Sequence, residues 1–345
     1  MVKYVISLIV VLVVICMICS CSNDETSQKQ LIFHVVDSTT FHFEGLNSLG
    51  ISDSLIYISN YFDNSIHCLS FDSTERCTFG GSGKGPGEFT LPGAIAMNGD
   101  TVAVADMTEN QIELFDSRGN FLQTLRLDSE YLIIGFTSFF FCHNDLYYET
   151  IKMGSFDEDF MEKIITYKMS NLKDAEIIKT YALHSTKDNC SYPIETLATL
   201  FPYRDSYVEV ENDNNLIIKD TGEHISLLSI PKERVGNDVK RFIEESGDYE
   251  HSQIKFPAYY PRVRNVFEIN NILFVLSFAQ SYNNLIDPHK NSLYYYDHKL
   301  KSFREMALPD HMLVSNLEIV RHNVMVFVDR ETEEISLFKI EIDQE

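Results

Sequence analysis

The sequence predicts an all-β chain built from repeated antiparallel units, and three observations carry this prediction. From residue 31 onward, apolar runs of about four to eight residues rich in Val, Ile, Tyr and Phe alternate with Asn, Asp, Ser and Gly. One outline of strand, polar turn and second strand recurs along the chain. The long amphipathic helices that an α/β domain needs between its strands are absent from the sequence.

The expected strands are the runs in which apolar residues alternate or cluster between turn residues. They are Leu31–Val36, Leu55–Ser59, Ile66–Phe71, Thr101–Ala105, Gln111–Phe115, Phe121–Leu125, Leu146–Glu149, Ile164–Lys168, Leu216–Lys219, His224–Ser229, Ile272–Ser277, Ser292–Tyr296, Val324–Val328 and Ile335–Ile340. Only the segment 235–246 (VGNDVKRFIEES) has a helical pattern, and we expect a helical insertion there.

The recurring outline predicts six units. The two best copies align Asn60 with Asp106, at an offset of 46 residues. The six units are anchored by the apolar residues Ile66, Ile112, Ile165, Ile225, Leu293 and Ile335. Successive anchors are 46, 53, 60, 68 and 42 residues apart, and about 40–50 residues is the usual length of a four-stranded propeller blade. We therefore predict a six-bladed β-propeller over residues 31–345; a seventh blade would fit if residues 126–160 or 230–260 contained one.

Ring closure follows from the same argument. A blade cannot bury both of its faces alone, so the blades must stack in a closed ring, and closure requires that the two chain ends share a blade. We expect Leu31–Val36 to pair with the blade made by residues 324–340.

The N-terminus carries an export signal. Lys3 precedes an apolar run that ends at Ile18, too short for a membrane span but suited to a signal peptide. The following Ile18-Cys19-Ser20-Cys21 resembles a bacterial lipobox, which predicts a signal peptide over residues 1–20, lipidation of Cys21 and a flexible tether over residues 21–30. Lipidation of Cys19 and an uncleaved anchor helix are the alternatives. The resemblance implies an outer-membrane lipoprotein that faces the cell surface or the periplasm.

Residues 80–122 carry a second resemblance. The run GGSGKGPGEF is followed by LPGAIA, VAVAD, Asn110, Ile112, Phe115-Asp116 and Gly119. This order closely resembles the NHL repeat, whose pattern is G-x-G-x-G-P-G-x-F, P-x-x-I-A, V-x-D, N-x-x-I, F-D and G. The remaining units resemble it only in hydrophobic outline, as in the six-bladed, TolB-like propeller lipoproteins of Bacteroidota, which the segment 256–263 (FPAYYPRV) also resembles.

Charge excludes some partners. The net charge of −23 repels nucleic acid phosphates and anionic lipid surfaces, so we expect no nucleic acid partner and membrane contact through the lipid anchor only. Catalytic motifs are absent: Gly83-Lys84 fails the Walker pattern, Ser82 lacks the context of a nucleophile elbow, and the histidines show no zinc spacing. We therefore predict no catalytic residue and no cofactor, with a divalent metal in the central channel as the alternative.

Propeller geometry indicates where ligands would bind. The resemblance to NHL-type propellers implies that connections entering the innermost strands and those following the second strands meet at one rim of the channel, and binding residues concentrate on such loops. The candidate ligand-binding residues at this rim are Asn60, Lys84, Asp106, Tyr260, Arg262 and Asp329. The alternatives are that the aspartates accept backbone N–H bonds in their own turns and that Arg262 pairs with an internal carboxylate.

Cys68 and Cys77 flank the turn 71–74 and are expected to face each other across a hairpin. A disulfide between them and two small buried hydrophobic residues are the two interpretations.

Three functions remain open. The first is a non-catalytic envelope lipoprotein that binds a protein, peptide or glycan. The second is a metal-dependent hydrolase, lactonase or lyase with its site in the central channel. The third is a structural component of an envelope assembly. The fold does not separate them, because function resides in the site.

Overall fold

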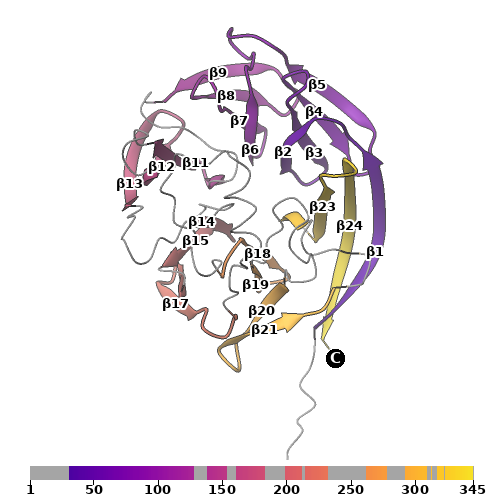
Figure 1. The fold of residues 1–345 in the computed structure, drawn as a ribbon, viewed down its shortest axis with the longest axis vertical. Helices are drawn as coiled ribbons and strands as arrows, with labels where there is room; N and C mark the ends of the chain where they lie inside the picture. The colour runs from indigo at the N-terminus through magenta and orange to yellow at the C-terminus, as the bar shows by residue number, and fades with distance from the viewer. Residues whose placement is uncertain are drawn as a thin grey trace, which may run out of the picture. The chain divides into compact units, whose positions relative to one another are not determined.

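The computed structural model describes residues 31–127, 138–153, 161–182, 199–211, 214–231, 262–277, 292–308, 312, 317–321 and 323–344. Every regular element within these ranges is a β-strand, and the strands form six four-stranded sheets. Residues Val35–Glu341 form one compact unit, in which the six sheets stand as blades in a ring (Figure 1). The predicted all-β, six-bladed propeller is confirmed.

Other expectations lie outside the described ranges: the signal peptide at 1–20, the tether at 21–30, the lipidation of Cys21 and the helical insertion at 235–246. No helix among the described residues is long and apolar enough to cross a membrane. A second unit comprises the chain ends, of which residues 31–34 and 342–344 are described; there His34 Nε2 lies 3.4 Å from Asp343 Oδ2.

The first three blades follow one another along the chain. From the inside outward, blade 1 contains β2 (Leu46–Ile51), β3 (Leu55–Asn60), β4 (Ser65–Ser70) and β5 (Glu75–Gly80). Blade 2 contains β6 (Pro92–Asn98), β7 (Thr101–Asp106), β8 (Gln111–Asp116) and β9 (Phe121–Arg126). Blade 3 contains β10 (Phe139–Cys142), β11 (Asp145–Met153), β12 (Met161–Ser170) and β13 (Asp174–Ala182).

The last three blades complete the ring. Blade 4 contains β14 (Leu200–Tyr203), β15 (Ser206–Glu211), β16 (Asn215–Ile218) and β17 (Glu223–Ser226). Blade 5 contains β18 (Asn265–Ile269), β19 (Ile272–Ser277), β20 (Ser292–Asp297) and β21 (Ser302–Met306). Blade 6 contains β22 (Leu317–Arg321), β23 (Val324–Asp329), β24 (Glu334–Gln344) and β1 (Leu31–His42). The first strand of each blade contacts the first strands of both neighbours, so these six strands line the inside of the ring.

The closing strand β1 pairs with β24, as predicted, and extends to His42 rather than ending at Val36. In Figure 1 the indigo N-terminal strand lies beside the yellow C-terminal strand. Thr40 Oγ1 and Ser336 Oγ share a hydrogen bond of 2.9 Å, and the Phe43 N–H donates to the Glu333 carbonyl oxygen at 2.8 Å. The last blade is thereby completed by the start of the chain.

The hydrophobic core lies between adjacent blades. Side chains alternate along a strand, so both faces of a central strand are buried. In β3, Ile58 packs in one cluster with Val326 of blade 6, whereas its neighbour Tyr57 packs in another cluster with Val104 of blade 2. This two-sided burial explains why the strand LIYIS is apolar at nearly every position rather than strictly alternating.

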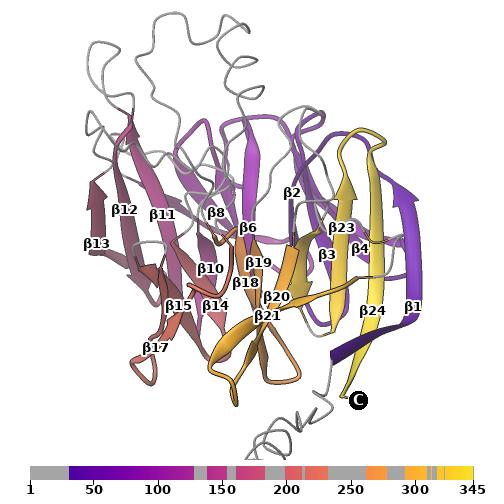
Figure 2. The same ribbon diagram turned by 60° about the horizontal axis from the view of Figure 1, so that its bottom comes forward.

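The two ends of the blades carry different connections. Strands one to two and three to four are joined by tight turns, such as residues 52–54 and 99–100; we call that end the hairpin rim. Because the strands are antiparallel, the remaining connections lie at the other end, the loop rim. Its described residues include 43–45, 61–64, 81–91, 107–110 and 330–333. Figure 2 shows the strands running side by side between the two ends.

Five of the six sequence anchors lie in the third strand of their blade, but Ile225 does not. Ile225 lies in β17, the fourth strand of blade 4, and the third strand is β16, which contains the buried Leu216. The reason is that the turn between β16 and β17, closed by Gly222 at φ 66°, has the same polar composition as the turns between second and third strands. Only the pairing of the strands distinguishes a turn between third and fourth strands from a turn between second and third strands.

Cys68 and Cys77 are direct cross-strand partners on β4 and β5, which confirms that they face each other. Both are free thiols in the structure, so the disulfide stays a prediction. Burial raises the pKa of the Cys68 thiol, and the hydrogen bond with Cys77 raises it further, which disfavours the thiolate.

We expect glutathione disulfide to oxidise this pair by first reacting with Cys77, which is only partly buried; Cys68 then displaces the bound glutathione, so that one S–S bond forms and two glutathione thiols are released. The bond should stabilise the fold by about 2–3 kcal/mol, because it constrains the unfolded chain. Peptide mapping after alkylation under denaturing conditions measures the pair, and a Cys142→Ser variant serves as control. Full alkylation of both cysteines after oxidation of the folded protein would contradict the prediction.

Candidate functional site

Four of the predicted ligand-binding residues lie at the loop rim of blades 6, 1 and 2. Asn60, Asp106 and Asp329 each end the second strand of a blade, at equivalent positions in β3, β7 and β23. Lys84 lies in the connection from blade 1 to blade 2. The alignment of Asn60 with Asp106 therefore identified true structural equivalents.

Asp106 is fully buried, and its carboxylate accepts hydrogen bonds from four backbone N–H groups. Oδ2 accepts from Thr90 (2.7 Å), and Oδ1 accepts from Leu91 (3.3 Å), Thr108 (3.0 Å) and Glu109 (3.1 Å). Two of these donors belong to its own turn and two to the segment that enters β6. The side chain joins the two segments rather than facing a ligand.

Asn60 and Asp329 also accept backbone hydrogen bonds from the turns that follow them in their own blades. Asn60 Oδ1 accepts from the Phe62 N–H at 2.7 Å, and its Nδ2 donates to the Glu44 carbonyl at 3.0 Å. Asp329 Oδ1 accepts from the backbone N–H groups of Glu331 (2.9 Å) and Thr332 (3.2 Å). These contacts agree with the turn-capping alternative that the sequence analysis considered for the two aspartates, and Asn60 makes an equivalent contact in its own turn.

Lys84 is exposed, but its Nζ lies 2.7 Å from Glu109 Oε1. The hydrogen bond from Lys84 lowers the pKa of Glu109, and the same bond raises the pKa of Lys84. Thr90 Oγ1 donates to Glu109 at 3.2 Å. Lys84 and Asp106 therefore both contact Glu109, which lies in the turn after β7.

The Gly/Pro run of residues 80–89 lies in the connection from β5 to β6 and is held by carboxylates from within the protein. The Gly85 N–H donates to Glu88 Oε2 at 2.8 Å, and the Gly87 N–H donates to the fully buried Glu113 at 3.3 Å. Burial raises the pKa of Glu113. Gly80, at φ 89°, lies so close to the Phe89 ring that a Cβ there would sit 2.7 Å from it. The segment is a packed joint between blades.

Arg262 lies apart from these residues, between blades 4 and 5. Its Nε donates to the Ile230 carbonyl at 2.9 Å and Nη1 donates to Asn214 Oδ1 at 3.1 Å. Tyr260 lies outside the described residues. The six candidates therefore do not form one constellation among the described residues: Asn60, Lys84, Asp106 and Asp329 share a rim region, and Arg262 joins two connections elsewhere.

Glu149 of blade 3 is also a buried carboxylate. Glu149 on β11 accepts from the backbone N–H groups of Ser138 and Thr199, both at 3.2 Å, and from the hydroxyls of Thr166 and Thr199. Burial raises its pKa. Thr199 directly precedes β14, so Glu149 ties blade 3 to blade 4.

Sequence reasoning missed the exposed aromatic pair Tyr61 and Phe62. Both lie in the turn after β3 at the loop rim, 44% and 63% exposed, with ring centroids 4.5 Å apart at an angle of 58°. Gly45 makes room for Phe62, because a Cβ at Gly45 would lie 2.6 Å from that ring. The available signal was two bulky aromatics at positions where turns normally carry small polar residues.

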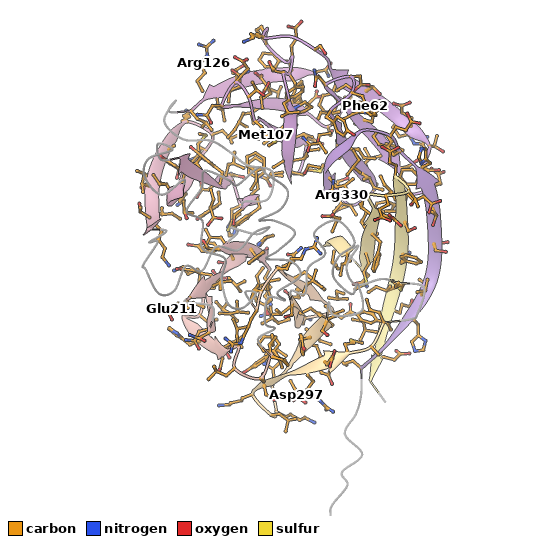
Figure 3. The ribbon with its side chains drawn as sticks, viewed as in Figure 1. Phe62, Met107, Arg126, Glu211, Asp297 and Arg330 are labelled. Carbon is orange, nitrogen blue, oxygen red and sulfur yellow. The ribbon has the colours of Figure 1, made fainter. Side chains whose placement is uncertain are left out.

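Figure 3 shows Phe62 on the same part of the ring as Arg330, which lies nearer the centre. Arg330 Nη2 lies 3.2 Å from Glu318 Oε1 of the innermost strand β22. Arg126, Glu211 and Asp297 lie toward the outside of the ring in that view. Among the described residues, His42, Glu44 and Glu333 each place a potential metal-ligand atom within 4.8 Å of the other two. This group lies beside the outer strands of blade 6.

No family model and no curated protein matches this sequence. The likeness of residues 80–122 to the NHL repeat consequently stays a resemblance. Solved structures do match. One, from Bacteroides fragilis, is a protein predicted to be exported; it covers 94% of this chain and 97% of its own, with 12% identity and a TM-score of 0.51.

A second solved structure is a member of the DUF4221 family from Bacteroides vulgatus, which covers 92% of this chain and all of its own, with 8% identity and a TM-score of 0.52. A third, virginiamycin B lyase from Staphylococcus aureus, covers 89% of this chain and 99% of its own at 11% identity, and its TM-score of 0.45 supports no argument. At these identities the likeness establishes the fold alone.

Proposed function

We propose that this protein is a non-catalytic, envelope-anchored binding module whose loop rim captures a protein or peptide partner, with Tyr61 and Phe62 as the anchoring side chains. The observation that carries the proposal is the exposed aromatic pair itself. Tyr and other large rigid side chains dominate the energy of protein interfaces because they bury much apolar area at little entropic cost.

The turn that carries the pair is pre-organised. Asn60 caps it through the Phe62 N–H, and Asn64 closes it at φ 55° while donating to Ser82 Oγ at 2.9 Å. A turn held in this way loses little conformational entropy on binding.

The two rings favour a polypeptide over a glycan. Their inclination of 58° provides no single flat platform for a sugar face. It provides instead a two-sided wedge that fits an apolar pocket on a partner. The net charge of −23 further favours a partner with a basic rim around that pocket.

The N-terminal sequence supports an envelope location. The apolar run before Cys21 and the polar segment after it are typical of a lipidated exported protein. The structural match from Bacteroides fragilis is itself predicted to be exported. The propeller would then be tethered to the outer membrane by acyl chains on Cys21 and held away from it by residues 21–30.

Cross-linking of the protein in its native envelope, followed by mass spectrometry, tests the proposal. We expect a reproducible partner linked through the loop rim, and a loss of about 30-fold in its affinity for the Tyr61→Ser/Phe62→Ser variant. Leu300→Ser is the matched control, because Leu300 is 53% exposed but lies in a hairpin-rim turn. Cys21→Ala should release the protein from membranes without altering the folded domain.

Capture that is equal for the double variant and for Leu300→Ser would refute the assigned binding face. Cross-links that map to sugar chains rather than to polypeptide would refute the partner class.

A further inference from the structure

Three potential metal ligands meet where the ring closes. His42 ends the closing strand β1, Glu44 lies in the connection from β1 to β2, and Glu333 lies in the turn between β23 and β24. One ligand atom from each lies within 4.8 Å of the other two. The three residues come from both ends of the chain, and all lie within the unit Val35–Glu341.

The His42 ring is oriented as in metal-binding histidines. Its Nδ1 lies 3.0 Å from the Thr332 carbonyl oxygen. A carbonyl oxygen only accepts, so Nδ1 is the donor of this bond, and in the neutral ring the lone pair is then on Nε2, the nitrogen that faces the carboxylates. This arrangement, in which a backbone carbonyl fixes the tautomer through the other nitrogen, is typical of histidines that bind a metal through Nε2.

The distances between the three ligand atoms leave room for a cation between them. His42 Nε2 lies 3.6 Å from Glu44 Oε1 and 3.8 Å from Glu333 Oε2, both longer than a hydrogen bond. Two ligands bound tetrahedrally to one zinc ion at about 2.1 Å lie about 3.4 Å apart. The two His42 distances are within about 0.4 Å of that value.

The choice of glutamate at position 333 is informative. Glu333 has φ 54°, and the equivalent left-handed positions in the turns of blades 1 and 2 are Asn64 (φ 55°) and Asn110 (φ 51°). Asparagine tolerates this conformation well because its side chain bonds locally, whereas glutamate gains nothing there. The chain thus has a less suitable turn residue at the one of these three turns that faces His42.

The turn is also held firmly enough to present its ligand. The Phe43 N–H donates to the Glu333 carbonyl at 2.8 Å, and Asn60 Nδ2 donates to the Glu44 carbonyl at 3.0 Å. The backbone on both sides of the cluster is therefore fixed, while the side chains remain accessible to solvent.

We propose that His42, Glu44 and Glu333 form a zinc site that clasps the closing strand to the last blade. Imidazole together with carboxylates suits Zn²⁺, and three protein ligands leave one position for water. Because the ligands join both chain ends, the ion stabilises the closed ring. This proposal does not rest on the proposed function, although Glu44 lies beside the turn that carries Tyr61 and Phe62, to which Asn60 joins it.

Calorimetric titration of the metal-stripped full-length chain in detergent with Zn²⁺ tests this site, together with thermal unfolding. We expect a saturable binding event and a rise in Tm of roughly 5 °C at 100-fold excess over Kd. His42→Gln and Glu333→Asn should each lose one equivalent of bound zinc and the rise in Tm. Glu331→Gln, a change in the same turn outside the cluster, should keep both.

Glu333→Asn separates metal binding from folding. Asparagine suits φ 54°, so the zinc-free variant should be at least as stable as the zinc-free parent. Zinc stoichiometry and Tm response that are the same in the parent, His42→Gln and Glu333→Asn would overturn the proposal, and so would a parent protein with no saturable binding.

Discussion

We expect the Asp106→Ala variant to lose about 3–5 kcal/mol of unfolding free energy, a large fraction of the stability of a typical domain. The loss has a specific cause. Asp106 is fully buried and accepts four backbone N–H bonds, and alanine would leave these donors unpaired where water has little access. Urea unfolding followed by circular dichroism measures the change.

Two further variants, which remove fewer or less buried hydrogen bonds, should lose less unfolding free energy. Asp106→Asn retains the oxygen that accepts from Leu91, Thr108 and Glu109 and loses only the bond from Thr90, so we expect a loss of about 1–2 kcal/mol. Asp329→Ala removes two bonds at a partly exposed turn and should cost about 1 kcal/mol. Similar losses for Asp106→Ala and Asp329→Ala would show that burial of the cap does not set its contribution.

The second large effect is expected at Glu149, where leucine should cost about 3–5 kcal/mol and glutamine less than about 1 kcal/mol. Leucine leaves two backbone N–H groups and two threonine hydroxyls without their acceptor. Glutamine keeps an oxygen for the N–H groups of Ser138 and Thr199, and its amide NH₂ donates to the hydroxyls of Thr166 and Thr199, which then act as acceptors.

The parent and the Glu149→Gln variant should also differ in how their unfolding free energy depends on pH. Burial raises the pKa of Glu149 above its ordinary value of 4.5. The folded chain therefore retains a proton that the unfolded chain releases, so this group's contribution to stability is full below pH 4.5 and falls as pH rises through the folded pKa. Glu149→Gln removes that fall.

Unfolding free energies measured from pH 4 to pH 8 test this expectation. The parent minus Glu149→Gln difference should become less favourable to the parent as pH rises. A difference that stays constant across this range would contradict the assignment of a raised pKa to Glu149.

Fourteen strands were expected from alternation and apolar runs, and each lies on an observed strand. None of the six innermost strands was among them. These strands are short and mixed: β2 reads LNSLGI, β6 reads PGAIAMN and β14 reads LFPY. An innermost strand faces the channel and both neighbouring blades, so its burial follows the curvature of the ring rather than a period of two. No pattern in the local sequence therefore predicts an innermost strand.

For the candidate rim residues too, the sequence predicted local features but not contacts between distant segments. Repeat alignment correctly placed Asn60 and Asp106 at equivalent strand ends, because turn chemistry is local. It did not reveal that Asp106 reaches the segment before β6, because Thr90 and Leu91 come near it only when the blade folds. Arg262 belongs to the connection from β17 to β18, at the same rim but in other blades, and its bonds to Ile230 and Asn214 also form only when the blades pack.

The sequence by itself determined the all-β class, the six repeats and the closing role of the N-terminal strand, because strand alternation, turn residues and repeat length are properties of neighbouring residues. Only the tertiary structure decided which polar residues act as buried caps, that Tyr61 and Phe62 stand exposed at the loop rim, and that His42 and Glu44 meet Glu333. These features depend on contacts between segments as far apart as the two ends of the chain, which are made only when the ring closes.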